Sequence, residues 1–511
     1  MQTYYVSTPI YYVNDKPHVG HAYTTIAADV LARYYRLAGR DVLFLTGVDE
    51  HGQKVEQAAD ERGITPAELA DSVVDDYRSL WPSLEISNDD FIRTSEERHK
   101  RAVSEMWRRL DAAGAIYKGF YEDLYCVPCE TYWTATQLKD AGHADDKRCP
   151  DCDRPVQQVK EESYFFRLGN YQEALLEHIR NNPDFIGPES RRNEVLRFVE
   201  GGLRDLSVSR TTFSWGIPVP GDEKHVIYVW IDALTNYLTG AGFPDGDMRH
   251  WPCDVHLIGK DILRFHAVYW PCMLLAAGIP LPKRVYAHGW WTVEGEKMSK
   301  SKGNALRPDK LLEEFDADTI RYFLLREVPF GHDGDFSHAA LKQRYNTELA
   351  NDIGNLLNRS LSMLHKYQDG VLVGVDSEEA ADRELVAAVE AMQRSVDDAM
   401  QRQAFHEALE HIQGVVRHGN RYVEDNAPWA LSKQGNTARL ATVLYHLVES
   451  LRLIVLQLSP FMPAKCDIML GQIMNADLQV KGLSLSEHGG WGLLAAGHVC
   501  AKPSPVFPRM E

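Results

Sequence analysis

The sequence lacks the features that direct a protein into a membrane or out of the cell. Its 511 residues contain no apolar run of about 18 residues, the length that spans a bilayer. The first residues show no basic stretch followed by an apolar block, so we expect no secretory signal. Eight cysteines are too few for a disulfide scaffold in a chain of this length. We therefore expect no membrane partner and a cytoplasmic location.

Basic residues are also scarce. Lys and Arg number 55 against 73 Asp and Glu, which gives a formal net charge of −18. Because phosphate contacts usually come from basic surfaces, this balance predicts weak non-specific binding to nucleic acids. It does not exclude RNA, provided that basic patches exist locally. The length allows about three domains with ample core.

Two histidines lie at a corner near the N-terminus. Residues 3–7 are β-branched and aromatic and predict a buried strand, whereas apolar spacings of three and four over residues 26–37 predict a helix. Such corners bind nucleotides in doubly wound sheets, because N–H groups at the helix start point at phosphates. His18 and His21 could donate to phosphate oxygens, and Gly20 would let a ligand approach the backbone. For this motif alone, capping or solvated histidines remain an alternative.

A lysine-rich motif, KMSKS, occupies residues 297–301. Taken alone, Lys297 and Lys300 could belong to a solvated basic loop. The order and wide separation of the two motifs, however, resemble the paired HIGH and KMSKS signatures of class I aminoacyl-tRNA synthetases. The resemblance implies that the histidines hold phosphates of ATP bound to Mg²⁺. It also implies that both lysines neutralise charge on the β- and γ-phosphates as their loop closes.

Four cysteines form two close pairs. Cys126 and Cys129, then Cys149 and Cys152, give two C-x2-C motifs separated by nineteen residues. This spacing fits a tetrahedral zinc site, and four thiolates leave no open position for a substrate, so we expect a structural metal. Free thiols are the alternative. A redox pair is disfavoured because neither motif follows a thioredoxin-like strand and helix. Related synthetases carry zinc knuckles in the corresponding insertion.

Two further features indicate the substrate. Asp49 follows a buried strand at residues 42–47, where it could meet a cationic ligand group or merely cap the next helix. Methionyl-tRNA synthetases carry a similar Gly-x-Asp-x-His-Gly motif, whose Asp holds the α-amino group of methionine. A helix expected after residues 255–258 places Ile262, His266 and Trp270 on one face. Without the motifs, such a stripe is typical of core packing.

The resemblance to methionyl-tRNA synthetases implies specific ligand contacts. An aromatic and apolar wall suits a polarizable thioether, and Tyr12 and His266 could offer hydrogen bonds near its sulfur. Arg210 would contact an anion and Asp261 the ribose. The implied amino-acid-binding residues are Ile10, Tyr12, Asp49, Trp230, Ala233, Leu234, Tyr237, Ile262, His266 and Trp270. The implied ATP-binding residues are His18, Gly20, His21, Arg210, Gly259, Asp261, His288, Gly289, Lys297 and Lys300.

The expected fold class is α/β. A Rossmann-type doubly wound parallel sheet is split by a zinc-binding insertion and followed by an all-α anticodon-binding helix bundle. Later strands are expected at residues 226–234, 255–258 and 285–289, and bundle helices at 385–400, 404–423 and 437–458. The expected domains are residues 1–116 and 226–296 for the sheet, 117–225 for the insertion, 297–345 for the KMSKS loop and link, 346–480 for the bundle and 481–511 for a tail that packs back.

The family binds the tRNA anticodon with this bundle. Trp429 matches a tryptophan that stacks on an anticodon base, and Asn351, Asn355 and Arg359 could read base edges. Ordinary packing roles are the alternative for these residues. No tRNA-binding barrel follows the bundle, so we expect a monomer. The insertion, about a hundred residues, is too short for a separate editing domain.

The resemblance implies a methionine–tRNA ligase whose partners are ATP, L-methionine and methionine tRNA. The methionine carboxylate would attack the α-phosphate of ATP, giving methionyl-adenylate and pyrophosphate. The terminal ribose hydroxyl of tRNA would then attack the acyl carbon. Neither step needs a protein nucleophile, so catalysis would rest on positioning and charge stabilisation. A small-molecule nucleotidyltransferase and a non-catalytic tRNA-binding homologue are the alternatives.

Overall fold

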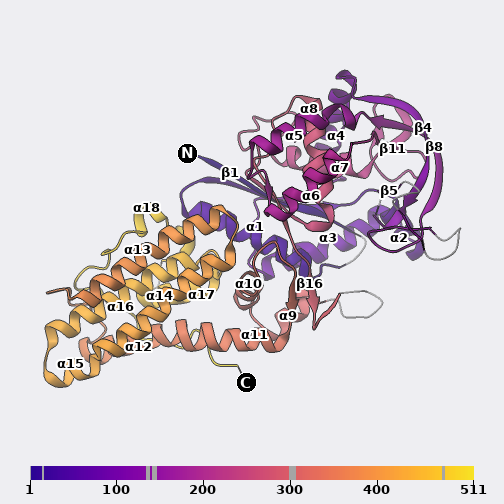
Figure 1. Cartoon of the computed structure of the whole chain (residues 1–511). Helices are drawn as coiled ribbons and strands as arrows, with labels where there is room; N and C mark the ends of the chain where they lie inside the picture. Colours follow the sequence, from indigo (N-terminus) through magenta and orange to yellow (C-terminus); the bar gives the residue numbers. More distant parts are fainter. Residues whose placement is uncertain are drawn as a thin grey trace.

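A parallel six-stranded sheet organises the first part of the chain. The computed structural model describes residues 2–13, 16–129, 131–133, 138–140, 147–297, 306–474 and 478–510. The strand order is β3-β2-β1-β14-β15-β9, with all neighbours parallel (Figure 1). The strands are β1 (Thr3–Tyr12), β2 (Asp41–Asp49), β3 (Asp90–Arg93), β9 (Ile186–Gly187), β14 (Val255–Gly259) and β15 (Val285–His288). The strand order reverses between β1 and β14, the position where such sheets bind ligands.

Helices cover both faces of this sheet. Successive side chains of β1 alternate between two cores: Tyr4 and Val6 pack with α1, whereas Tyr5 packs with α4 and α7. Both faces are therefore buried, as expected for a parallel sheet. The helices are α1 (Val19–Leu37), α2 (Gln53–Arg62), α3 (Pro66–Ser83), α4 (Glu97–Ala112), α7 (Val229–Gly240) and α8 (Trp270–Ala277).

The strand predicted over residues 226–234 is wrong. Strand β13 (Asp222–Ile227) belongs to a separate antiparallel sheet with β11 (Ser209–Arg210) and β12 (Pro218–Val219), and the following residues form helix α7. Within the predicted run only Asp232 is charged, so residues 226–234 alone show no polar face that would reveal a helical period. The polar positions Thr235, Asn236 and Thr239, which continue that period, lie beyond the run and are buried.

The segment between the two halves of the sheet is dominated by a long antiparallel ribbon, β4 (Ile116–Cys126) with β8 (Gln157–Phe166). Strand β9 of the same segment nevertheless pairs with β15 at the edge of the parallel sheet. The other elements here are β5 (Thr131–Trp133), β6 (Lys139–Asp140), β7 (Lys147–Arg148), α5 (Gln172–Asn181), α6 (Glu189–Glu200) and β10 (Leu206–Ser207). The domain bounds proposed from the sequence stay a prediction.

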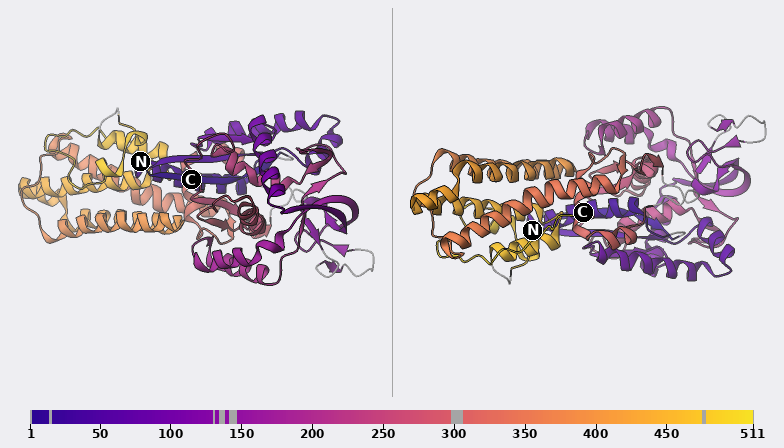
Figure 2. Two further views of the ribbon diagram at one scale, coloured as in Figure 1. Left: turned by 90° about the horizontal axis from the view of Figure 1, so that it is seen from above. Right: turned by 90° about the horizontal axis from the view of Figure 1, so that it is seen from below.

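A helix bundle extends away from the sheet, opposite the ribbon (Figure 2). Its helices match the predicted ranges: α13 (Ala380–Gln401), α14 (Phe405–Asn426) and α16 (Thr437–Leu458). Among the described residues, α16 alone is long and apolar enough to cross a membrane, but it is fully buried as the central core helix. The remaining helices are α11 (His338–Arg344), α12 (Asn355–Gln368), α15 (Pro428–Gln434), α17 (Pro463–Ile473) and α18 (Leu485–His488), with a π-helix at Tyr345–Gly354.

A small sheet and the tail border the bundle. Helices α9 (Pro308–Glu314) and α10 (Ala317–Arg326) lie in the chain between β17 (Glu296–Lys297) and β18 (Gly334–Phe336) of this sheet, which also contains β16 (Trp291–Val293). The tail packs on the bundle: the backbone N–H groups of Gly492 and Leu493 donate to Glu449, and that of Met510 donates to Asn346.

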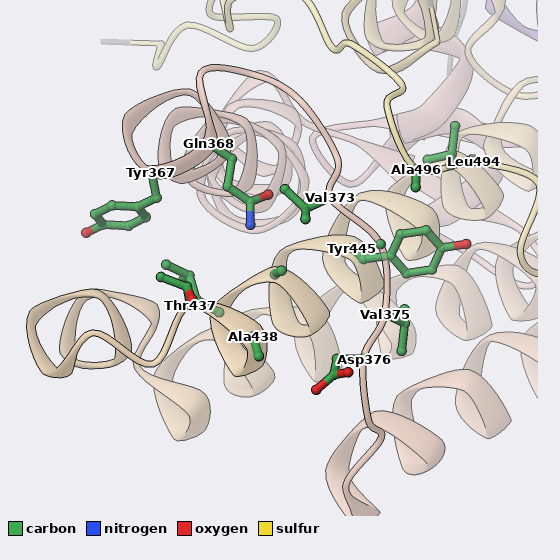
Figure 3. Close-up of a pocket in the computed structure, with 13 residues that line it drawn as sticks. Tyr367, Gln368, Val373, Val375, Asp376, Thr437, Ala438, Tyr445, Leu494 and Ala496 are labelled. Carbon is green, nitrogen blue, oxygen red and sulfur yellow. The ribbon is translucent and has the colours of Figure 1, made fainter.

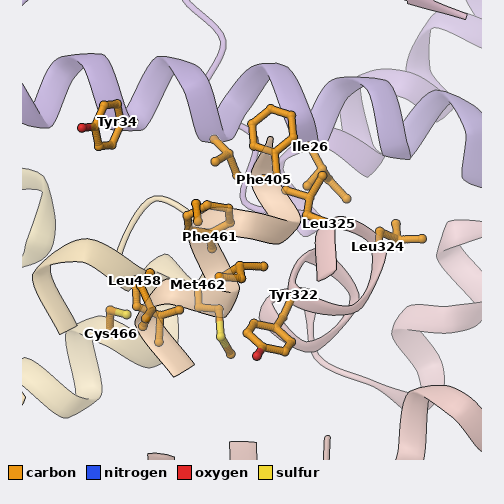
Figure 4. Close-up of a cluster of buried hydrophobic side chains, with 14 of the residues drawn as sticks. Ile26, Tyr34, Tyr322, Leu324, Leu325, Phe405, Leu458, Phe461, Met462 and Cys466 are labelled. Carbon is orange, nitrogen blue, oxygen red and sulfur yellow. The ribbon is translucent and has the colours of Figure 1, made fainter. Parts of the chain in front are cut away.

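A hydrophobic junction joins α1 to α10 and the bundle (Figure 4). Within it, the buried guanidinium of Arg321 lies 2.7 Å from the Asp29 carboxylate and donates to the carbonyls of Pro460 and Phe461 at 2.8 and 2.9 Å. Burial alone would raise the pKa of Asp29, but Arg33 and Arg321 outweigh it and lower the pKa below its usual range. Helix α1 is thus fixed to the end of α16 by a buried ion pair.

We predict that Arg321→Met lowers the free energy of unfolding by about 3–5 kcal/mol, because it removes one partner of a buried pair and leaves three carbonyls, those of Leu84, Pro460 and Phe461, without their donor. Urea denaturation measures this change. Arg402→Met is the matched control: Arg402 pairs with Glu407 at the surface, so its loss should cost less than about 1 kcal/mol. Equal midpoint shifts for the two variants would contradict the prediction.

Candidate active site and metal cluster

The first turn of α1 is capped by two imidazoles. Nδ1 of His18 accepts the backbone N–H of Gly20 at 3.0 Å, and Nδ1 of His21 accepts that of His18 at 3.3 Å. The rings stack with centroids 3.7 Å apart. A Cβ on residue 20 would lie 2.9 Å from the His18 ring, so glycine is required for this cap. The corner predicted from the sequence is confirmed as a strand-to-helix turn.

This cap decides which nitrogen of each histidine can donate. Because Nδ1 accepts a backbone N–H, the proton of the neutral ring sits on Nε2, which is the donor that a phosphate oxygen needs. Burial, and then the neighbouring His18, lower the pKa of His21 well below its ordinary value. His21 is therefore neutral at pH 7.

The carboxyl ends of the central strands meet beside this turn. Gly259 of β14 pairs with His288 of β15, and Asp261 follows in the 3-10 turn Lys260–Ile262. Nε2 of His288 bonds the Thr24 hydroxyl of α1 at 2.6 Å, and Nδ1 bonds the Gly289 carbonyl at 2.8 Å. Both ring nitrogens of His288 are thus engaged within the protein, and its ring ties α1 to β15.

On the other side of β1, Tyr12 pairs with Asp49 of β2. Asp49 is 2 % exposed at the strand end, so a cationic ligand group would be well matched to its carboxylate. Arg210 is also buried: it donates to the Ser207 hydroxyl and stacks over the Tyr228 ring.

An aromatic cluster lies between α7 and α8. The Tyr237 hydroxyl bonds Nε2 of His266 at 2.7 Å, and Nδ1 of His266 bonds the Ile262 carbonyl at 3.0 Å. Burial lowers the pKa of His266 to about 4, so the ring is neutral. Its Nε2 accepts a hydrogen bond from the Tyr237 hydroxyl. The Trp230 ring stacks on Phe265 at 3.7 Å. Within this cluster, the predicted Ala233, Leu234 and Trp270 are buried, and Ile10, Tyr12 and Ile262 pack at its edge.

The single helix predicted over Ile262, His266 and Trp270 is wrong in detail. A π-helical turn, Phe265–Tyr269, separates the 3-10 turn from α8. The three residues still lie in one cluster, because the wider turn brings His266 back onto the Ile262 carbonyl.

A buried polar triad beside this cluster escaped the sequence analysis. Asp232 of α7 bonds Nδ1 of His51 at 2.6 Å and Nε2 of His99 at 2.8 Å. Burial alone would raise the pKa of Asp232, but the two histidines outweigh it and lower the pKa to about 2. His51 belongs to the Asp-x-His-Gly motif, which was the available signal; Asp232 was hidden in the run assigned to a strand. The triad fixes α7 against the end of β2 and α4.

The four paired cysteines converge in the insertion. Their sulfur atoms all lie within 4.8 Å of one another, with 3.5 Å between Cys126 and Cys152 and 3.8 Å between Cys129 and Cys149. A tetrahedral zinc with bonds of about 2.3 Å requires sulfur separations of about 3.8 Å. Hydrogen bonds from the neighbouring thiols lower the pKa of Cys126 to about 5. The cluster therefore fits a structural metal and leaves no ligand position for a substrate.

Three of the residues predicted to contact the anticodon line one cavity in the bundle. It measures 630 Å³ and includes Asn351, Asn355 and Arg359, and Arg359 pairs with Glu424 at 2.6 Å. Trp429, in α15, is 44 % exposed, so the alternative of a buried core tryptophan is wrong.

A larger cavity of 790 Å³ lies between α12, α16 and the tail (Figure 3). Its lining includes Val373, Tyr445 and Leu494, and none of the predicted site residues. We therefore place the chemistry at the sheet and not in this cavity.

Comparisons with known proteins match this arrangement. A family model of class I tRNA synthetases (M) matches residues 4–361, and a model of the anticodon-binding domain of methionyl tRNA ligase matches residues 374–511. The chain belongs to the methionyl-tRNA synthetases. The match of both models in sequence order confirms the predicted family and excludes a small-molecule nucleotidyltransferase.

Individual methionine–tRNA ligases and a solved synthetase structure are similar to this chain over its full length. The methionine–tRNA ligase of Caldanaerobacter subterraneus is 49 % identical over all of this chain and 79 % of its own length, and that of Rickettsia bellii is 48 % identical over 100 % and 99 %. The Mycobacterium tuberculosis methionyl-tRNA synthetase in complex with methionyl-adenylate superposes with a TM-score of 0.95 at 46 % identity, covering 100 % of both chains.

The chain is thus an ATP-dependent methionine–tRNA ligase, and the predicted fold class is confirmed. The roles of individual residues stay predictions. The Lys297 backbone ends β17, whereas Lys300 lies outside the described residues.

Proposed function

We propose that this methionyl-tRNA synthetase activates methionine at the carboxyl edge of its parallel sheet and holds the tRNA anticodon with its bundle. The capped first turn of α1 carries this proposal: it engages Nδ1 of two imidazoles, which makes Nε2 the donor of each ring, at the point where the strand order reverses. ATP–pyrophosphate exchange across a panel of amino acids tests it. Exchange that depends on methionine alone supports the proposal, and exchange with another amino acid contradicts it.

In this proposal, ATP lies over the start of α1. His18 and His21 donate to phosphate oxygens through Nε2, and the dipole of α1 favours negative charge at the same helix start. Gly259 and Gly289 allow the nucleotide to approach the backbone, while Asp261 accepts a hydrogen bond from the ribose. His288 contributes indirectly by holding α1 against β15. Mg²⁺ enters with ATP and supplies charge neutralisation on its phosphates.

Methionine lies between α7 and α8. Asp49 pairs with the α-amino group, and Arg210 attracts the carboxylate. The aromatic cluster around Trp230 and Tyr237 encloses the thioether, with the hydroxyl of Tyr12 near sulfur and His266 holding the Tyr237 hydroxyl in place. A neutral His266 suits this task, because a buried imidazolium beside an apolar side chain would be strongly disfavoured.

Three further properties belong to the proposal. Zinc is the structural metal, held by Cys126, Cys129, Cys149 and Cys152. The substrates methionine, ATP and methionine tRNA meet on one polypeptide that acts as a monomer. The enzyme works in the cytoplasm, where reduced thiolates persist as zinc ligands.

We predict one tightly bound zinc per chain. Elemental analysis of freshly purified enzyme should find a molar ratio near one, and Cys149→Ser should lower it because three thiolates no longer complete the tetrahedron. Cys500→Ser is the matched control, since Cys500 is buried outside the cluster and should leave the zinc content unchanged. Full metal content in the Cys149→Ser variant would contradict the assignment.

We predict that Lys300→Ala slows methionyl-adenylate formation far more than it weakens methionine binding. A lysine that meets the phosphates only on loop closure acts mainly on the transition state, so kcat should fall with little change in the KM for methionine. Steady-state exchange measures both constants. Unchanged exchange would remove Lys300 from the catalytic machinery.

We predict that Trp429→Ala lowers kcat/KM for tRNA aminoacylation by about one to two powers of ten, equivalent to roughly 1–3 kcal/mol of base stacking. Exchange without tRNA should stay near the wild-type rate, because Trp429 lies in the bundle. The melting temperature should also stay close to that of the wild type, because the indole is 44 % exposed. A parallel loss of exchange and aminoacylation would contradict an anticodon role.

A further inference from the structure

Trp290 stands beside the proposed nucleotide site although no motif pointed to it. It follows β15 and Gly289, and its side chain is 41 % exposed. The indole Nε1 lies 3.2 Å from Oδ1 of Asp261, the carboxylate assigned to the ribose. An exposed tryptophan that aims its only hydrogen-bond donor at a functional carboxylate has a use beyond packing.

The indole is held in place from two directions. The backbone N–H of Trp290 donates to Oδ1 of Asp333 at 2.8 Å. Nζ of Lys260 lies 4.2 Å from the centre of the indole ring and bonds both oxygens of Asp333 at 2.7 Å. One carboxylate thus fixes both the backbone of Trp290 and the cation that covers its ring.

The backbone at His332 can approach residue 289 this closely only because residue 289 is glycine. A Cβ on Gly289 would lie 2.2 Å from the carbonyl oxygen of His332, which directly precedes Asp333. The carbonyl of Trp290 also accepts the N–H of Gly334 at 2.8 Å. Trp290 is therefore anchored on both sides of its peptide.

Asp261 has little else to orient it. It is exposed on a 3-10 turn, and the indole N–H supplies the one side-chain hydrogen bond to its carboxylate that the described residues provide. Without that bond, the carboxylate would rotate freely in solvent, and a ligand hydroxyl would have to order it on binding.

We propose that Trp290 is a positioning residue for ATP: it fixes the Asp261 carboxylate so that a ribose hydroxyl meets an oriented acceptor. The inference rests on the proposed contact of Asp261 with the ribose. Because the contact is made with bound ATP and with the transition state alike, its loss should raise the KM for ATP more than it lowers kcat.

The test compares ATP with 2′-deoxy-ATP and 3′-deoxy-ATP in methionine-dependent pyrophosphate exchange. Trp290→Phe keeps an aromatic ring under Lys260 but removes the N–H. It should lower kcat/KM for ATP by roughly 3- to 10-fold, the scale of one hydrogen bond to a charged group. For the deoxy analogue that lacks the contacted hydroxyl, the loss should be less than about 2-fold. The KM for methionine should not change.

Two variants separate this inference from the proposal beneath it. Asp261→Ala should remove the preference of the enzyme for ATP over the same analogue, and adding Trp290→Phe should then cause no further loss. If Asp261→Ala keeps the wild-type preference for ATP over both analogues, the ribose assignment fails and the inference fails with it. Two other outcomes overturn the inference on Trp290 alone. In the first, Asp261→Ala removes the preference for ATP, whereas Trp290→Phe keeps the full preference of the wild type. In the second, the losses in kcat/KM of Asp261→Ala and Trp290→Phe add in the double variant.

Trp491→Phe is the matched control. Trp491 lies beside His446 of the bundle, so the same substitution there should leave exchange with all three nucleotides at the wild-type level. Thermal unfolding of each variant completes the set. A drop in melting temperature for Trp290→Phe, with equal losses for ATP and both analogues, would assign Trp290 a merely structural role and overturn the proposal.

Discussion

The first turn of α1 imposes the constraint on which the rest of the site depends. A helix start leaves backbone N–H groups without partners, and here two of them are satisfied by Nδ1 of His18 and His21. The cap orients both rings and commits each Nε2 to donation. The same residues that complete the helix are therefore the ones proposed to bind phosphate, and Gly20 is needed because a side chain there would displace the His18 ring.

Helix α1 also carries this local geometry to distant parts of the molecule. Thr24 holds His288 of β15, so the turn is fixed relative to the strand that leads into Trp290 and the KMSKS loop. One and a half turns further along the helix, Asp29 pairs with Arg321. The guanidinium of Arg321 donates to the carbonyls of Pro460 and Phe461, which follow α16. The bundle and the first turn of α1 are therefore attached to the same helix by buried polar contacts.

The sequence predicted those parts of the molecule whose chemistry is local. The histidine corner, the cysteine spacing and the amphipathic bundle helices each carry their signal within a few residues, and the structure places them as expected. The strand prediction for residues 226–234 failed because this run contains one charged residue, Asp232. The polar positions that continue its helical period, Thr235, Asn236 and Thr239, lie beyond the run and are buried with it. A spacing of three, one and three residues also indicates the helix in the sequence, and it separates Trp230, Ala233, Leu234 and Tyr237.

Contacts between distant residues could not be predicted from one sequence. Asp232 meets His51 and His99 across separations of 181 and 133 positions, and Trp290 meets Asp261 only because Gly289 lets the chain at His332 approach. No periodicity encodes such pairings, since each depends on how whole elements pack. The motifs therefore indicate residues that are close in sequence, and they miss the partners that distant elements bring to those residues.

The acidic charge of the chain fits the way its bundle meets RNA. In the 630 Å³ cavity, Arg359 pairs with Glu424, and Arg417 pairs with Glu410 at 2.6 Å. Arg359 and Arg417 are thus compensated and would attract phosphate weakly, which leaves Arg421 as the cation of this lining without an ion pair among the described residues. In the proposed anticodon site, stacking and base-edge hydrogen bonds would therefore carry recognition. Electrostatic attraction is the same for every tRNA, whereas stacking and base-edge contacts differ between anticodons. A net charge of −18 thus lowers affinity for all RNA while leaving discrimination to the bases.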